Sequence, residues 1–335
     1  MGKATIKDVA ALAGVSSATV SHVINKTRFV SDETKARVQR AIEELSYSTN
    51  VTARNFRTGK NNTIGVIIPD ISNSYFATIV EELESVISRK KYNLIVSNTK
   101  ETKSKELSYI RLLTSGLVDG LVIASTCDSF SELQNVLPDG FPAVFIDRTL
   151  ADNTCYDTIC MQDAEIIRRG VEQLVVDGHQ NIGYIAGLRR LSTTVDRLRA
   201  YQDVMTQHQI YCEGKLVRYA DSMANSAYHC AQELIEQNCT ALVVSNNIMT
   251  TDALRFIYNA GLQPGKDIAV FGYGYNDWRN YIPQNIRLII QPDRELGRLA
   301  GNRILACIKS LPKQPEVFAL ESQLSNDILA KCTNV

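Results

Sequence analysis

The 335-residue sequence lacks the features of a membrane or secreted protein. It contains no apolar run of about 18 residues or more, the length that a membrane-spanning helix needs. The start of the chain, MGKATIKDVA, has no apolar core of the kind found in a signal peptide. Its eight cysteines occur singly, without a C-x-x-C pair, which argues against a disulfide framework or a zinc site. These absences predict a cytoplasmic protein with no membrane partner and no bound metal.

Motifs of enzyme chemistry are absent as well. The sequence contains neither G-x-G-x-x-G nor a P-loop, so it gives no support to chemistry on nucleotide phosphates. The four histidines are spread along the chain without a neighbouring nucleophile or the spacing of metal ligands. Of these, His179 is expected to close a turn. We therefore expect a protein that is not an enzyme and that needs no cofactor.

The zero net charge of the chain conceals an uneven distribution. Residues 1–60 carry ten Lys and Arg against five Asp and Glu, so this segment has a net charge of +5 and the remainder a net charge of −5. A basic segment at one end of an acidic body is typical of a module that meets nucleic-acid phosphates. The length of the chain suits such a small module followed by a large α/β body.

The stretch from Thr5 to Asn25, TIKDVAALAGVSSATVSHVIN, predicts two short helices joined by a tight turn. Thr5 and Asp8 have the spacing of a capping box, and an apolar stripe begins at Ile6. Gly14 supplies the turn and Ser16 caps the second helix. A third helix is expected over residues 32–45, with Ser31 as its N-cap.

The second helix carries an outward face of small, uncharged residues. Val20, Val23 and Ile24 face inward, which leaves this set outside: Ser17, Ala18, Ser21, His22 and Asn25. Such side chains suit base edges in a major groove, whereas an ordinary exposed helix more often carries Glu and Lys. An ordinary helical hairpin is the alternative interpretation. The candidate DNA-binding residues of this segment are Thr5, Ser16, Ser17, Ala18, Thr19, Ser21, His22, Asn25 and Lys26, with Ser17, Ala18 and His22 as the expected base readers.

Residues 47–60, YSTNVTARNFRTGK, follow the pattern Y-x-P-N-x-x-A-R-x-L with Thr49 in place of Pro and Phe56 in place of Leu. Together with the first 25 residues, this stretch resembles the lactose/galactose repressor (LacI/GalR) family of bacterial transcription factors. The segment VSHVINKTRFV is most similar to the purine and ribose repressors of that family. The resemblance implies a hinge helix that orders on DNA, with Asn50, Ala53, Arg54 and Phe56 as further DNA-binding candidates. Phe56 either inserts into the minor groove or packs against the body.

From Asn62 onward, strands alternate with helices, which predicts an α/β body of two Rossmann-like lobes. The resemblance extends to G-H-x-x-I-x-x-I-x-G at 178–187 and to Gln291-Pro292, and implies the type I periplasmic-binding-protein fold. Strands are expected at 64–68, 94–96, 121–124, 143–146, 182–186, 216–219, 241–244 and 268–271. The expected division is a helix-turn-helix headpiece over 1–46, a hinge over 47–60 and an effector-binding and dimerisation domain over 61–335. Within it, the N-lobe takes about 61–160 and 293–320, and the C-lobe about 161–291 and 321–335.

A small molecule is expected at the carboxyl ends of the strands, between the lobes. Side chains that follow the first and fourth strands are effector candidates: Asn73, Tyr75, Phe76, Asp147 and Arg148. The resemblance adds Arg197, with Arg199 as an alternative, and Asn246. The family usually has an Asp where Gly274 stands, so Tyr275 or Asp277 is expected to replace it.

These features predict a ligand-responsive repressor that binds a palindromic operator in double-stranded DNA as a homodimer in the bacterial cytoplasm, associated with the nucleoid. The expected effector is a sugar or a sugar phosphate, and a purine or nucleoside is the alternative. A solute-binding protein without a regulatory role and an enzyme on a Rossmann-like body are the competing hypotheses. Salt-dependent DNA binding separates the repressor from the solute-binding protein.

Overall fold

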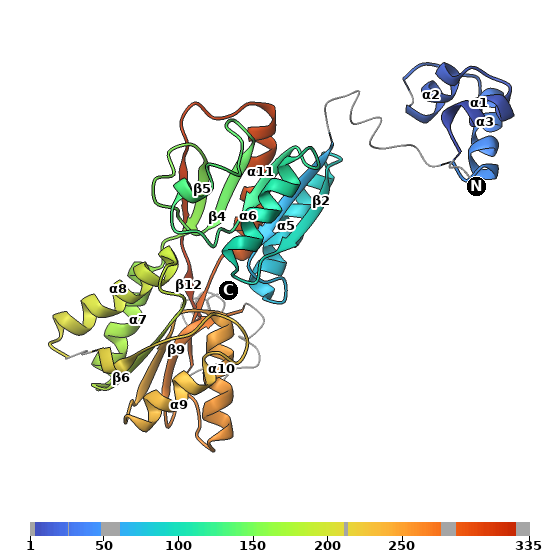
Figure 1. Ribbon diagram of the computed structural model, residues 1–335. Helices are drawn as coiled ribbons and strands as arrows, with labels where there is room; N and C mark the ends of the chain where they lie inside the picture. Colours follow the sequence, from blue (N-terminus) through green and yellow to red (C-terminus); the bar gives the residue numbers. More distant parts are fainter. Residues whose placement is uncertain (1–3, 26, 48–60, 211–213, 276–285, 326–335) are drawn as a thin grey trace, which may run out of the picture. The chain divides into compact units, whose positions relative to one another are not determined.

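The described part of the chain contains three helices near the N-terminus and two mainly parallel sheets with helices on their faces (Figure 1). The computed structural model describes residues 4–25, 27–47, 61–210, 214–275 and 286–325. The chain divides into two compact units, Met1–Asn61 and Asn62–Val335. None of the helices in the described ranges is long and apolar enough to cross a membrane.

The first unit, the headpiece, contains α1 (Ile6–Ala13), α2 (Ser17–Asn25) and α3 (Asp32–Glu44). The predicted capping box is confirmed: Thr5 accepts from the Asp8 amide, and the Asp8 side chain accepts from the Thr5 amide at 2.8 Å. Gly14 ends α1 at a φ of 65°, a left-handed conformation that glycine adopts without strain. The Ser16 hydroxyl caps α2 by accepting from the Thr19 amide at 3.1 Å. A small apolar core closes the unit, formed by Val9, Ala10, Ala13, Val20, Val38 and Ala41.

The second unit begins with a six-stranded sheet of order β11-β5-β4-β3-β1-β2. Its strands are β1 (Thr63–Ile68), β2 (Asn93–Asn98), β3 (Gly120–Ile123), β4 (Ala143–Asp147), β5 (Asp157–Met161) and β11 (Val317–Leu320). Helices α5 (Ser74–Ser88) and α11 (Asp293–Lys309) cover one face. Helix α6 (Lys103–Thr114) and the segment around the 3-10 turn η1 (Phe130–Glu132) cover the other. This sheet and its helices are called the first lobe.

The second lobe contains the six-stranded sheet of order β12-β10-β9-β8-β6-β7. Its strands are β6 (Ile182–Ala186), β7 (Val217–Tyr219), β8 (Ala241–Val244), β9 (Ala269–Gly274), β10 (Arg287–Ile290) and β12 (Gln323–Leu324). Helices α7 (Ala164–Val176) and α8 (Ser192–Gln207) cover one face, and α9 (Tyr228–Glu236) and α10 (Asn247–Asn259) cover the other. The 3-10 turn η2 (Gly214–Leu216) precedes β7. The chain passes between the lobes after β5, after β10 and after β11.

The sequence-based elements are confirmed except in a few places. The strands β5, β10, β11 and β12 are not among the strands expected from the sequence. The sequence also predicts a helix over residues 224–236, but α9 begins only at Tyr228. Ser222 and Asn225, just before it, have φ angles of 64° and 74° that a right-handed helix cannot contain. The sequence does not indicate β5 because this strand begins with the charged residue Asp157. The Asp157 carboxylate is fully buried, and its Oδ2 lies 2.6 Å from a guanidinium nitrogen of Arg303.

Helices α5 and α11 approach closely at Gly297, where a Cβ would lie 2.5 Å from the carbonyl oxygen of Ile79. Because backbone cannot move aside as a flexible side chain can, Gly297→Ala is expected to lower the free energy of unfolding by about 1–3 kcal/mol. Urea unfolding of the full chain measures this. Gly214→Ala is the control, since its Cβ would meet no atom of the described residues within 4 Å. Equal midpoints for the two variants would contradict the close packing of α5 on α11.

Candidate functional site

The headpiece holds its predicted DNA-binding side chains on and around α2. The imidazole Nδ1 of His22 lies 2.8 Å from the Thr27 hydroxyl, which fixes the ring, and Asn25 donates to the Ser21 carbonyl at 2.8 Å. The hydroxyl oxygens of Ser16 and Thr19 lie 2.9 Å apart, so both side chains belong to the cap of α2. Thr5 likewise belongs to the cap of α1.

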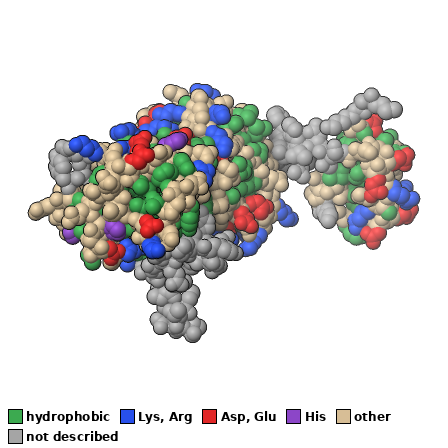
Figure 2. Space-filling view, turned by 90° about the horizontal axis from the view of Figure 1, so that it is seen from below, with side chains coloured by type: hydrophobic (Ala, Val, Ile, Leu, Met, Phe, Trp, Pro, Cys, Tyr) green, Lys and Arg blue, Asp and Glu red, His purple; other side chains and the backbone are tan. Residues whose placement is uncertain are grey.

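The candidate side chains on α2 differ in how exposed they are. Ala18 and Asn25 are exposed, and Ser17, Ser21 and His22 are partly exposed. The candidates Lys26, Asn50, Ala53, Arg54 and Phe56 lie outside the described residues. On the visible face of the body in Figure 2, basic and acidic side chains are interspersed, without a broad field of one sign.

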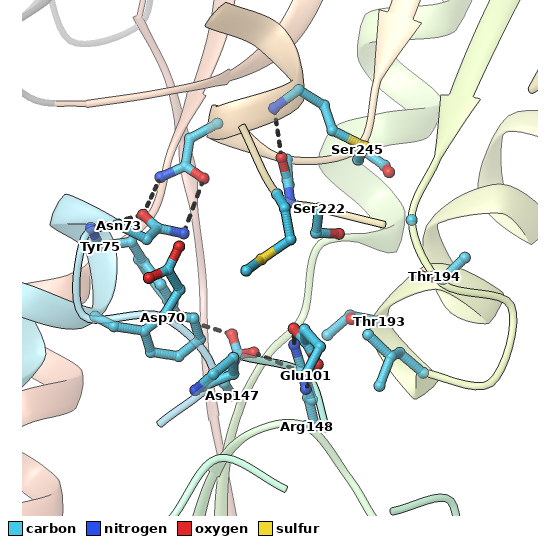
Figure 3. Close-up of a pocket in the computed structure, with 18 of the residues that line it drawn as sticks. Asp70, Asn73, Tyr75, Glu101, Asp147, Arg148, Thr193, Thr194, Ser222 and Ser245 are labelled. Carbon is cyan, nitrogen blue, oxygen red and sulfur yellow. Dashed lines mark hydrogen bonds and ion pairs between the residues drawn. The ribbon is translucent and has the colours of Figure 1, made fainter. Parts of the chain in front are cut away.

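The second unit contains a pocket at the carboxyl ends of β1, β2, β4, β6, β7 and β8, as the alternation of strands and helices predicts. Its cavity volume in this structure is about 60 Å³. Both lobes contribute: Thr193 and Thr194 approach from one side and Tyr75, Asp147 and Arg148 from the other (Figure 3). The effector candidates Asn73, Tyr75, Phe76, Asp147, Arg148, Arg197 and Asn246 line it. We call this pocket the cleft.

Asp147 ends β4 in the middle of the cleft and accepts a hydrogen bond from the Tyr75 hydroxyl at 2.9 Å (Figure 3). Burial raises the pKa of the Asp147 carboxyl above its ordinary value, although Arg148 and Arg197 favour the ionised form. Burial and the nearby Asp147 also raise the pKa of Tyr75. Phe76 contacts Tyr75 edge-on, with ring centroids 5.1 Å apart, and belongs to the core of the first lobe. The two rings therefore build the wall behind Asp147.

Arg148 is held by two parallel contacts to the Glu101 carboxylate, at 3.0 and 2.5 Å, and by the Ser125 carbonyl at 2.9 Å. The two side chains are only 7% and 8% exposed, so this is a buried ion pair. Asp70, at the end of β1, accepts from Lys100 and Ser72. Burial acts to raise the pKa of Asp70, but these hydrogen bonds outweigh it and hold the pKa below its ordinary value.

Arg197 comes from α8 in the second lobe and is 8% exposed. It donates to Asp163 at 2.7 Å and to the Ser245 carbonyl at 2.8 Å, and its guanidinium lies 4.2 Å from the centre of the Tyr273 ring. Tyr273 also donates to Asp163, at 2.8 Å. The alternative Arg199 is exposed on the same helix, and it does not line the cleft.

Amide side chains join the two lobes at the cleft. Asn73, the N-cap of α5, and Asn247 of α10 exchange two hydrogen bonds, of 2.9 and 3.4 Å (Figure 3). The Tyr275 hydroxyl lies 3.4 Å from the same Asn73 oxygen. Asn246 caps α10 by accepting from the Met249 amide at 2.8 Å.

Two further residues of the second lobe make hydrogen bonds to the first. Arg190 donates to the carbonyls of Thr126 and Glu101, at 3.2 and 3.0 Å, and the Ser192 hydroxyl accepts from the Thr149 amide at 3.0 Å. The lobes are thus hydrogen-bonded to each other around the cleft.

Gly274 stands where the resemblance implies an Asp. A Cβ at this position would lie 2.7 Å from Leu288 Cδ1, so a side chain here requires the Leu288 side chain to shift. Of the two expected replacements, Tyr275 lies beside Asn73. Asp277 lies outside the described residues.

Several residues of the site were missed from the sequence. Glu101, Asp163 and Asn247 were not singled out, although each contacts a predicted residue directly. Glu101 stands in the polar run TKETK, which is typical of a solvated loop. A usable signal was position, since Glu101 comes shortly after the end of β2 and Asp147 is the last residue of β4.

Comparison with known proteins decides the family. Residues 5–50 match the model described as bacterial regulatory proteins, lacI family, and residues 61–286 match that of periplasmic binding proteins and the sugar binding domain of the LacI family. The chain belongs to the LacI family.

Curated relatives match nearly the full length of this chain. The HTH-type transcriptional repressor PurR of Vibrio atlanticus (strain LGP32) is 30% identical, covering 99% of this chain and 100% of the relative. PurR of Aliivibrio fischeri (strain ATCC 700601 / ES114) is 32% identical, covering 96% of each. A lac repressor dimer bound to operator and the anti-inducer ONPF has a TM-score of 0.78 and 29% identity, covering 96% of this chain and 98% of that one. A complex of the regulator CelR with cellobiose, at 24% identity and a TM-score of 0.68, shares the fold.

The LacI assignment carries three conclusions. The chain is a DNA-binding transcriptional regulator with an effector domain, and its family is one of regulators rather than enzymes. Its two sheets form the type I fold of periplasmic binding proteins. The solute-binding protein without a headpiece is excluded as an alternative, because the LacI DNA-binding model matches residues 5–50.

Proposed function

We propose that this LacI-family protein binds a palindromic operator in double-stranded DNA as a homodimer in the bacterial cytoplasm, associated with the nucleoid, and is gated by a small molecule that binds in the cleft. The observation that carries the proposal is the presence, in one chain, of α2 with an uncharged outer face and a polar cleft between two lobes. Two headpieces suit a two-fold operator. A ligand that prefers one lobe arrangement shifts the equilibrium between arrangements.

In this proposal, residues 1–46 form the reading module, 47–60 the hinge and 61–335 the effector-binding and dimerisation domain. Ser17, Ala18 and His22 read bases. The fixed ring of His22 supports this role, since a side chain held in place loses less entropy on binding. The hinge candidates Asn50, Ala53, Arg54 and Phe56 take their roles from the family resemblance.

The proposed effector is a sugar or a sugar phosphate, and the name of the matching body model favours a sugar. The PurR names of full-length relatives at about 30% identity favour a purine or nucleoside as the second candidate. In either case Arg197 and Asp147 are positioned to border the ligand from opposite lobes, since both line the cleft.

Selection of double-stranded DNA from a random pool tests the DNA half of the proposal. We expect an enriched palindrome whose affinity falls steeply with salt, because phosphate contacts release counterions. His22→Ala and Ser17→Ala are expected to weaken binding to that sequence by about 10- to 100-fold and to relax the preference at one base pair per half-site. Gln39→Ala on the exposed side of α3 is the control. Enrichment of no sequence, or equal affinity of all four proteins, would contradict the proposal.

A further inference from the structure

Each positive group of the cleft is paired with a carboxylate. Three carboxylates, from Asp70, Glu101 and Asp147, and two guanidinium groups, from Arg148 and Arg197, belong to its lining. Asp163, directly behind Arg197, adds a fourth carboxylate. The lining therefore holds more negative than positive charge, and each positive group already has a carboxylate partner.

Several contacts hold the Arg148–Glu101 ion pair in place. Both terminal guanidinium nitrogens contact the carboxylate, one of them also donates to the Ser125 carbonyl, and Nε lies 3.4 Å from Asp147 Oδ2. A fork of this kind between planar groups is the strongest form of an ion pair in proteins. The buried Nε has no hydrogen-bond partner among the described residues, but the two terminal nitrogens of Arg148 can meet a ligand only if they lose an existing contact.

The backbone is held in an unfavourable conformation to place these carboxylates. Lys100, Glu101 and Asp147 have φ angles of 51°, 54° and 69°, in the left-handed region that non-glycine residues seldom occupy. All three follow or end a strand at the cleft. Strain of this kind persists where a site requires it. The positions of Glu101 and Asp147 around Arg148 are thus a feature of the site.

Other sources of positive charge at the cleft are occupied in the same way. Lys100 is paired with Asp70, and Arg190 donates to two backbone carbonyls of the first lobe. The N-termini of α5 and α10 are capped by Asn73 and Asn246. Helix α8, which begins at Ser192, has no side-chain cap. An anion would have to bind at α8 alone or displace a buried carboxylate.

We infer that the cleft excludes anions and that the effector is uncharged. Glu101 is the residue that prevents Arg148 from binding an anion, because it occupies the guanidinium group. The inference rests on the proposed function and narrows its ligand class, because it removes sugar phosphates and nucleotides and keeps neutral sugars, nucleosides and nucleobases. Displacing Glu101 would leave a carboxylate buried without its partner, which costs more than a ligand phosphate returns.

Neutral hydrogen-bonding groups remain for such a ligand. Thr194 is buried at the cleft, and Ser222 and Asn246 line it beside the apolar Met223 and Met249. The buried Nε2 of Gln291, also in the lining, has no hydrogen-bond partner among the described residues. Hydroxyl or carbonyl oxygens of a neutral ligand supply the acceptor that this donor lacks.

Matched pairs of compounds that differ only by a phosphate test the inference. The full-length protein is melted at constant ionic strength with ribose and ribose 5-phosphate, glucose and glucose 6-phosphate, and guanosine and its monophosphate. We expect any stabilising compound to be the unphosphorylated member, and its identity distinguishes a sugar from a nucleoside. A larger increase in Tm with any phosphorylated member would overturn the inference, whether the compound binds at Arg148 or at α8.

Inorganic phosphate tests the role of Glu101 without knowledge of the effector. Wild-type protein is expected to show no phosphate-dependent increase in Tm, whereas Glu101→Gln leaves Arg148 without its carboxylate and is expected to bind phosphate about tenfold more tightly or better. The double variant Glu101→Gln/Arg148→Gln should lose that response. Glu84→Gln, on the exposed side of α5, makes the same change of charge outside the cleft and is the control.

Two outcomes would overturn the role of Glu101. The first is a phosphate-dependent increase in the Tm of the wild type that Arg148→Gln removes. The second is a folded Glu101→Gln protein whose Tm does not respond to phosphate. If Glu101→Gln does not fold, Asp163→Asn makes the same test at Arg197. Operator binding by the same preparations is measured separately, so failure of the proposed function is recognised by itself.

Discussion

Arg197→Ala is expected to lower the free energy of unfolding of the body by about 3–5 kcal/mol, because it leaves the Asp163 carboxylate buried without its charge partner. Asp163 is 4% exposed and would keep only the hydroxyls of Tyr273 and Ser322, at 2.8 and 2.6 Å. The same substitution opens the wall of the cleft on the side of the second lobe. The variant should therefore also lose its stabilisation by any ligand that stabilises the wild type.

Urea unfolding measures the first effect, and Arg199→Ala is its matched control. Arg199 lies on the same helix two residues away, but it is exposed, so its removal should change the free energy of unfolding by less than about 0.5 kcal/mol. The double variant Arg197→Ala/Asp163→Ala should recover part of the loss, because it removes the isolated charge as well. If Arg197→Ala were as stable as Arg199→Ala, the buried pair would not be a stabilising part of the native structure.

Val20→Asp is expected to abolish operator binding, with an apparent Kd raised by about 100-fold or more. Val20 is fully buried between the three helices of the headpiece, whose small core leaves little stability in reserve. A carboxylate at this position would be buried without a partner and would unfold the headpiece. The headpiece is a compact unit of its own, so the melting transition of the body should stay unchanged.

Leu12→Asp is the control for this variant. Leu12 lies on α1 of the same unit and is 47% exposed, so a carboxylate there remains in water. Gel-shift titration gives the operator affinity, and calorimetry gives the melting of the body. Operator binding by Val20→Asp at the level of Leu12→Asp would show that the headpiece does not need this core to read DNA.

What the sequence predicted well was local. The caps of α1 and α2, the turn at Gly14 and most strands follow from residues a few positions apart, so patterns of spacing reveal them. The candidate cleft residues were placed by a topological rule together with family resemblance, and seven of those in the described ranges line one cavity. No spacing pattern was needed to find them.

What the sequence concealed was non-local. Arg197 and Asp163 are 34 residues apart, Arg148 and Glu101 are 47 apart, and Asn73 and Asn247 are 174 apart. In the sequence each partner is an ordinary polar residue, because only the folded sheets place it beside the residue that it contacts. Asp157 of β5 is a similar case, since its contacts with Arg303 and with the Glu316 amide make a buried carboxylate acceptable inside a strand.

The measurement that tests the account most directly is the coupling between the cleft and DNA. A ligand that raises the Tm of the wild type is added to a titration of the selected operator, and operator is added to a titration of that ligand. The account predicts that ligand changes the operator Kd by about 5- to 150-fold and that operator changes the ligand Kd by the same factor. A ligand that binds in the cleft, with Arg197→Ala removing the effect, and yet leaves the operator Kd unchanged would contradict it.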